Sequence, residues 1–107
     1  MDNMLVTMEE STRNEALTIT NASQVISNSR PDRSRKAITI RNIADDATKI
    51  ITVNFGAQQA TANAGIVLRQ YESVSDSSET GYECFQGTIT AVCAVASVTA
   101  DLTIFER

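Results

Sequence analysis

The chain has 107 residues, of which 42% are hydrophobic and 21% charged, as expected for one globular domain with a thin core rather than a disordered chain. Its net charge is −4, and it has no histidine and only two cysteines, so it lacks the commonest general base and a closed set of zinc ligands. These absences predict a protein that is not an enzyme and holds no metal or cofactor. No apolar run approaches the roughly 20 residues that cross a bilayer, so we also expect no contact with a membrane.

The first fifteen residues show no regular alternation of apolar and polar side chains. We interpret residues 1–15 as an N-terminal arm or edge segment that packs on a neighbour or frays, with a short amphipathic helix as the alternative. The remainder, residues 16–107, is rich in side chains that suit a pleated sheet. In the whole chain Ile, Val and Thr account for 31 residues and Leu for only four, so the sequence predicts a single all-β domain.

Short strands follow one another through this domain, with turn signals about every ten residues. The predicted strands cover residues 16–20, 23–27, 36–42, 49–55, 65–68, 71–74, 88–95 and 98–106. The alternation is clearest in the third strand, where Ile38 and Ile40 share one face and Thr39 and Arg41 the other. Seven or eight strands at this spacing indicate a single antiparallel β-sandwich or a jelly-roll-like domain. The residues that we expect in its core are Leu17, Ile19, Ile38, Ile40, Ile51, Val53, Phe55, Ile89, Ala91, Cys93, Leu102 and Ile104.

A basic segment, residues 30–41, lies within this acidic chain. Its net charge is +4, because one acid, Asp32, stands against five cations: Arg30, Arg33, Arg35, Lys36 and Arg41. We predict that these cations contact an acidic protein surface, and a solvated loop without a partner is the alternative. Because the rest of the chain is acidic and aromatic residues are few, we expect no binding of nucleic acid. Loop positions rarely support a core, so replacing the three loop arginines is expected to leave the fold intact.

Other side chains suggest sites less strongly. The acids Asp45 and Asp46, and the acidic tip at residues 76–79, could bind calcium, but their spacing does not match an EF-hand loop and acids in turns are usually solvated. The aromatic residues Tyr71 and Tyr82 could form a platform for a sugar, although residues at an interface or at the core edge are the simpler interpretation.

The two cysteines are nine residues apart. Cys93 lies in a run of Ala and Val and is expected to be a small buried hydrophobe, and Cys84 lies near a predicted turn. Two reduced thiols are the simplest interpretation, and the spacing leaves a disulfide open.

Two stretches carry a resemblance to a known class of proteins. Residues 33–68 read RSRKAITIRNIADDATKIITVNFGAQQATANAGIVL, and residues 87–96 read GTITAVCAVA. This pattern resembles small β-sandwich structural proteins of tailed bacteriophages. The resemblance implies a component of the virion, either a head decoration (cement) protein or an accessory protein of the tail or fibre, and it implies no catalytic residues.

We take capsid decoration as the leading hypothesis for this chain. The expected partners are then the major capsid protein and further copies of the chain in a homo-oligomer on the capsid exterior, since association would cover the edge strands of a small sandwich. The alternative is a tail or fibre module that binds a glycan on the host surface.

Overall fold

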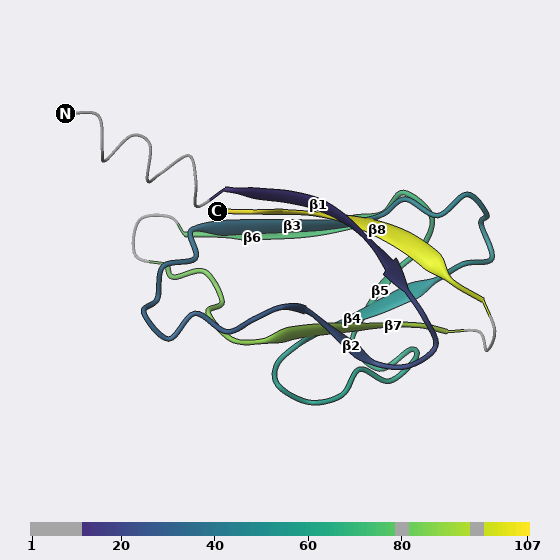
Figure 1. Cartoon of the computed structure of the whole chain (residues 1–107), viewed down its shortest axis with the longest axis horizontal. Helices are drawn as coiled ribbons and strands as arrows, with labels where there is room; N and C mark the ends of the chain where they lie inside the picture. Colours follow the sequence, from purple (N-terminus) through teal and green to yellow (C-terminus); the bar gives the residue numbers. More distant parts are fainter. Residues whose placement is uncertain (1–11, 79–81, 95–97) are drawn as a thin grey trace.

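The computed structural model describes residues 12–78, 82–94 and 98–107. Within these residues the chain forms eight strands and no helix, and so none long and apolar enough to cross a membrane. The strands are β1 (Arg13–Ile19), β2 (Gln24–Ser27), β3 (Ala37–Asn42), β4 (Ile51–Phe55), β5 (Ile66–Leu68), β6 (Ser73–Ser77), β7 (Ile89–Cys93) and β8 (Ala100–Glu106). They form two four-stranded antiparallel sheets that lie one above the other (Figure 1).

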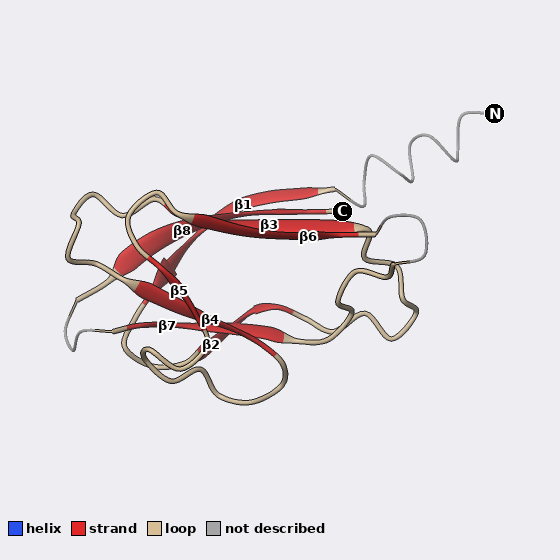
Figure 2. Cartoon of the chain, turned by 180° about the vertical axis from the view of Figure 1, so that it is seen from behind, coloured by secondary structure: helices blue, strands red, loops and turns tan. Residues whose placement is uncertain are grey.

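We call the sheet with the strand order β1-β8-β3-β6 sheet A and the sheet with the order β2-β7-β4-β5 sheet B. The chain crosses between the sheets repeatedly, and this order is that of an eight-stranded jelly roll. Figure 2 shows the two layers of strands with loops at both ends. The prediction of an all-β sandwich with a jelly-roll-like order is therefore confirmed.

Most strand boundaries differ from the expectation by one to three residues, and the largest differences are at β1 and β6. The first strand, β1, begins at Arg13, inside the predicted arm of residues 1–15, because Arg13 to Glu15 pair with β8. The rest of that arm falls almost wholly on residues 1–11, which lie outside the described residues. A strand was predicted at residues 71–74, whereas β6 begins at Ser73, because the preceding residues form a turn.

The core lies between the two sheets and follows the predicted alternation. Ten of the twelve residues expected there are buried, and the other two, Leu17 and Phe55, are half-buried against the core. Leu17 is on the edge strand β1, which only one neighbouring strand covers. Phe55 ends β4, where its ring packs against Phe85 with the ring centroids 5.4 Å apart.

Part of the outer face of sheet B is covered by the chain itself. The segment 56–65, which joins β4 to β5, folds below this sheet in Figure 1. The hydroxyl of Thr90 on β7 donates to the carbonyl oxygen of Gln58 at 3.0 Å, and the hydroxyl oxygen of Thr52 on β4 accepts from the N–H of Asn63 at 3.0 Å. Because of this cover Thr52 and Thr90 are buried although they point away from the core.

The burial of Ile40 gives a direct test of this packing. Ile40 exposes 0% of its surface at the centre of β3, so the substitution Ile40→Ala should lower the free energy of unfolding by about 2–5 kcal/mol. Urea denaturation of the two proteins measures the difference. A midpoint close to that of the wild type would contradict the assignment of Ile40 to the core.

Candidate functional site

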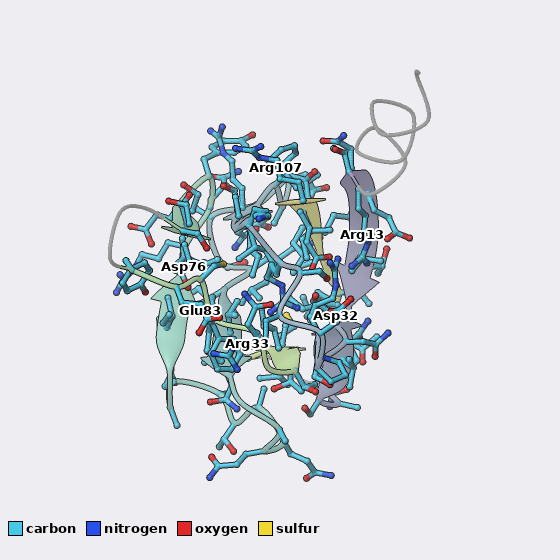
Figure 3. The ribbon with its side chains drawn as sticks, turned by 90° about the vertical axis from the view of Figure 1, so that its left-hand side faces the viewer. Arg13, Asp32, Arg33, Asp76, Glu83 and Arg107 are labelled. Atoms are coloured by element: carbon cyan, nitrogen blue, oxygen red, sulfur yellow. The ribbon has the colours of Figure 1, made fainter. Side chains whose placement is uncertain are left out.

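The segment 28–36 carries most of the predicted basic patch and passes from β2 in sheet B to β3 in sheet A. It runs across one end of the sandwich, where charged side chains from several loops gather (Figure 3). A tight turn opens it, in which the N–H of Arg33 donates to the carbonyl oxygen of Arg30 at 2.8 Å. Arg33 has a φ of 58°, a left-handed conformation, and its side chain remains 64% exposed. The turn leaves Arg33 in solvent, whereas Arg35, two residues later, is buried.

The guanidinium of Arg35 lies inside the protein, and its side chain exposes 0% of its surface. All five of its N–H donors have an acceptor. Nε donates to the carboxylate of Glu106 at 2.8 Å. The two Nη atoms donate, over 2.6 to 3.0 Å, to the hydroxyl of Ser27 and to the carbonyl oxygens of Asn28, Phe85 and Gly87. The prediction that Arg35 contacts an acidic partner at the surface is wrong, because its acidic partner is Glu106 of the same chain.

The carboxylate of Glu106 is the centre of this cluster. Oε2 accepts from the hydroxyl of Ser27 at 2.6 Å and from Arg35, and it lies 3.3 Å from Nη2 of Arg30. Oε1 accepts from Nη1 of Arg13 at 3.2 Å. Burial works to raise the pKa of Glu106, but the hydrogen bonds from Ser27 and Arg35 and the charges of Arg30 and Arg35 outweigh it and hold the pKa below its ordinary value of 4.5. The carboxylate is therefore ionised inside the fold and is surrounded by three arginines.

The other predicted contact residues are in different surroundings. Arg33 forms an exposed ion pair with Glu83, and the two side chains point toward one another in Figure 3. Lys36 is exposed beside the buried Arg35. Arg41 is exposed on β3, where its Nε donates to the carbonyl oxygen of Tyr71 at 3.1 Å. The structure thus does not gather the five cations into one patch, and contact of the exposed ones with an acidic partner stays a prediction.

The two exposed tyrosines lie near opposite ends of β6. Tyr71 comes two residues before the strand, whereas the hydroxyl of Tyr82 donates to Asp76 near the other end of it, at 2.9 Å. Each ring is more than half exposed, at 57% and 58%. A sugar platform that uses both rings is therefore not formed.

The paired acids of the turn after β3 have structural partners. Asp45 forms an ion pair with Lys49 at 2.9 Å, and Asp46 accepts from the N–H and the hydroxyl of Thr48, each at 2.8 Å. In the parts of the chain that the structure describes, no three His, Cys, Asp or Glu side chains come together as a metal site would require. These acids hold a turn, as expected of acids in such positions.

Both cysteines are free and buried. Burial, with a smaller contribution from the charge of Asp76, raises the pKa of the Cys84 thiol above its ordinary value. Cys93 faces the core from β7, opposite Ile51 of β4. Neither thiol is placed to act as a nucleophile at the surface.

Three residues of the cluster were not recognised in the sequence: Ser27, Gln86 and Glu106. The amide of Gln86 holds the backbone of Arg35 from both sides, accepting from its N–H at 2.9 Å and donating to its carbonyl oxygen at 2.7 Å. A signal existed for Glu106, because it continues the inward alternation of Leu102 and Ile104 on β8. No comparable signal marks Ser27 or Gln86, which lie 8 and 51 positions from Arg35.

The comparisons with known proteins bear on the fold. No family model matches the chain, and no curated protein matches it. Among solved structures, a chain of the Bacillus endospore appendages, a family of disulfide-linked pili, is similar to it. The TM-score is 0.55 and the identity 16%, over 89% of this chain and 81% of that chain. At this identity the likeness shows a shared sandwich fold, and that neighbour is a structural protein.

Removal of the buried guanidinium should destabilise the fold strongly. The substitution Arg35→Ala takes the buried guanidinium away from the carboxylate of Glu106 and from three backbone carbonyl groups, and we expect a loss of about 3–5 kcal/mol in the free energy of unfolding. The matched control is Arg33→Ala, which removes an exposed ion pair and should change the stability little. Equal urea midpoints for the two variants would show that Arg35 does not hold the sheets together.

The lowered pKa of Glu106 predicts how stability depends on pH. A carboxyl whose pKa is lower in the folded than in the unfolded protein stabilises the fold at pH values above its ordinary pKa of 4.5. This contribution is lost as the pH falls through the folded pKa. The free energy of unfolding of the wild type should therefore decrease from about pH 5 downward. The variant Glu106→Gln should be less stable at neutral pH and should show a shallower decrease. Parallel profiles from pH 7 to pH 3 would exclude Glu106 as a source of the acid dependence.

Proposed function

We propose that this chain is a non-enzymatic structural subunit that packs against copies of itself in a protein assembly on the outside of a particle or cell. The observation that carries this proposal is the pair of long, regular edge strands of sheet A, β1 and β6, whose outer backbone groups have no partner among the described residues. The fold that it shares with an endospore appendage, a pilus subunit, supports such a role. The buried ion cluster supports the non-enzymatic part of the proposal, because its polar groups bond to one another inside the fold.

The edges of the two sheets differ in how well they could pair with another chain. In sheet B, β2 has four residues and an irregular register, and β5 has three residues. Short and bulged edge strands are poor templates for pairing. In sheet A, β1 has seven residues and β6 has five, both in regular register. Sheet A is therefore the sheet that a neighbouring copy could extend.

The hydrogen bonds at the ends of β6 define which of its groups face outward. The N–H of Ser78 donates to Lys36, and that of Asn42 donates to the carbonyl oxygen of Glu72. Since partners alternate along an antiparallel pair, the N–H groups of Val74 and Asp76 face β3. The outward groups belong to Ser73, Ser75 and Ser77.

Pairing of β6 with β1 of the next copy would join unlike edges. Such a head-to-tail contact does not close on itself unless the rotation between copies completes a ring, so it generates open arrays or rings. The cysteines take no part in these contacts, because Cys84 and Cys93 each expose only 1% of their surface. An assembly of this chain would accordingly be held without the disulfides of the similar pili.

Capsid decoration is the finer assignment that the resemblance of residues 33–68 to phage structural proteins favours, and the exposed cations Arg33, Lys36 and Arg41 suit an acidic shell. Electron microscopy of the purified protein, together with co-sedimentation with bare phage shells, distinguishes the two settings. Filaments or rings formed by the protein alone support an appendage, and binding to shells supports decoration. A protein that stays monomeric and binds no shell would contradict the proposed function.

The edge strand itself can be tested with a proline. The variant Ser75→Pro removes an outward N–H from β6 without removing a hydrogen bond to β3, so the fold should persist while growth of the assembly stops. The control Ser75→Ala loses the same hydroxyl contact with Thr39 but keeps the N–H, and it should assemble like the wild type. Sedimentation velocity measures the size distribution of each protein. Growth of Ser75→Pro to wild-type size would exclude β6 as a contact edge.

A further inference from the structure

Among the described residues no segment crosses the outer face of sheet A, whereas segment 56–65 covers part of that of sheet B (Figure 1). Within the strands, its outward side chains are small or carry a hydroxyl or amide group, apart from one phenylalanine and two charged residues. They are Asn14, Ala16, Thr18, Ala37, Thr39, Arg41, Ser73, Ser75, Ser77, Asp101, Thr103 and Phe105. A sheet face that stays in water usually carries many charges, whereas the strand residues of this face include one cation and one anion.

At one end of this face stands a residue in an unfavourable conformation. Tyr71 has a φ of 65° in the turn between β5 and β6, where the N–H of Glu72 donates to the carbonyl oxygen of Arg69 at 3.0 Å. Glycine or asparagine takes the third position of such a turn at little cost, whereas tyrosine is strained there. The ring is also 57% exposed and so contributes little to the core. Strain of this kind at an exposed aromatic residue points to a role outside the fold.

Arg41 and Tyr71 form one unit. The guanidinium carbon of Arg41 lies 5.7 Å from the centroid of the Tyr71 ring, and its Nε donates to the Tyr71 carbonyl oxygen. Its two Nη atoms have no acceptor among the described residues, so they are available to a carboxylate from another molecule. Tyrosine and arginine are the residue types that most often anchor protein interfaces.

The same face carries the complementary acid. Asp101 is on β8, two residues from Thr103, which pairs with Arg41. One of its oxygens accepts from the hydroxyl of Thr18 at 2.9 Å, and within the described chain no donor reaches the other. The cation and the anion therefore lie on neighbouring strands and form no ion pair with each other in the described chain.

We propose that the outer face of sheet A binds the same face of a second copy across a twofold axis, with Tyr71 and Arg41 as its anchors. This inference rests on the proposed function and names the partner. A twofold axis brings Arg41 of each copy to Asp101 of the other, so the charges pair twice and the rest of the face meets small side chains. Such side chains let two sheets approach to the roughly 10 Å of packed sheets. The contact is perpendicular to the sheet and does not compete with pairing along its edges.

Charge exchange tests the twofold contact. In Arg41→Asp two carboxylates meet, in Asp101→Arg two cations meet, and each variant alone should dimerise at least tenfold more weakly than the wild type. An equimolar mixture of the two variants should dimerise again, because unlike charges then face each other at both contacts. Sedimentation velocity over a concentration series measures this, and Lys36→Asp is the control, since it changes the net charge as Arg41→Asp does at a position off the face. A mixture that does not recover would overturn the inference.

A variant of Tyr71 can distinguish a role of this residue at the interface from a role in the fold. The variant Tyr71→Gly relieves the backbone strain, so its melting temperature should equal or exceed that of the wild type while its dimerisation weakens at least tenfold. A lower melting temperature with unchanged dimerisation would make Tyr71 a structural residue and contradict the proposal. If the wild type associates and all these variants associate equally well, the face contact is wrong and the edge contacts of the proposed function remain. A wild-type protein that is monomeric at every concentration would exclude both.

Discussion

One buried carboxylate, that of Glu106, determines how the two sheets meet at the end of the sandwich where β2 leads to β3. It projects from sheet A, its hydroxyl partner Ser27 belongs to sheet B, and the guanidinium of Arg35 joins both. Each group satisfies the others, so the loss of any one leaves buried polar atoms unpaired and the cluster behaves as a unit. The net stabilisation by a buried ion pair over apolar packing is small or negative. We therefore understand the cluster chiefly as a constraint on where segment 28–36 lies.

A second polar residue acts at the other end of β3. The side-chain amide of Asn42 donates to the carbonyl oxygens of Lys49 and Leu68, each at 2.9 Å, and accepts from the N–H of Ala44 at 2.8 Å. Leu68 belongs to sheet B, so Asn42 joins the two sheets as Arg35 does at the opposite end. The apolar residues of β3 lie between these two polar contacts, which limit how far one sheet can shift against the other. In a protein with a thin core, such contacts at both ends help to fix one relative position of the two sheets.

The sequence predicts the parts of this design that depend on local alternation. The inward residues of β3 and β8 follow from a period of two, and the same period places Glu106 inside, although a charged residue argues against burial when its partner is unknown. Arg35 could not be found in this way, because its acceptors come from segments 7 to 71 residues away and it precedes the alternating run. Its charge predicts a surface position. Arg35 can be buried only because β2, β8 and the segment before β7 come together around it and supply its acceptors. The strain at Tyr71 is also invisible in the sequence, since it arises from the turn that sets up β6.

The two sheets differ in charge and in how far the described chain covers their outer faces. No strand of sheet B contains a charged residue, and segment 56–65 covers the part of its outer face where Thr52 and Thr90 are buried, while Val25 on β2 stays exposed. The strands of sheet A contain Arg13, Glu15, Arg41, Asp76, Asp101 and Glu106. On the inner side of that sheet Arg13, Glu15 and Glu106 form ion pairs. Asp76 accepts from Tyr82 and Phe85. Arg41 and Asp101 point outward from strands at the centre of the sheet. Among the described residues no comparable segment lies over sheet A (Figure 1), and this is the face on which we place the proposed contact between copies.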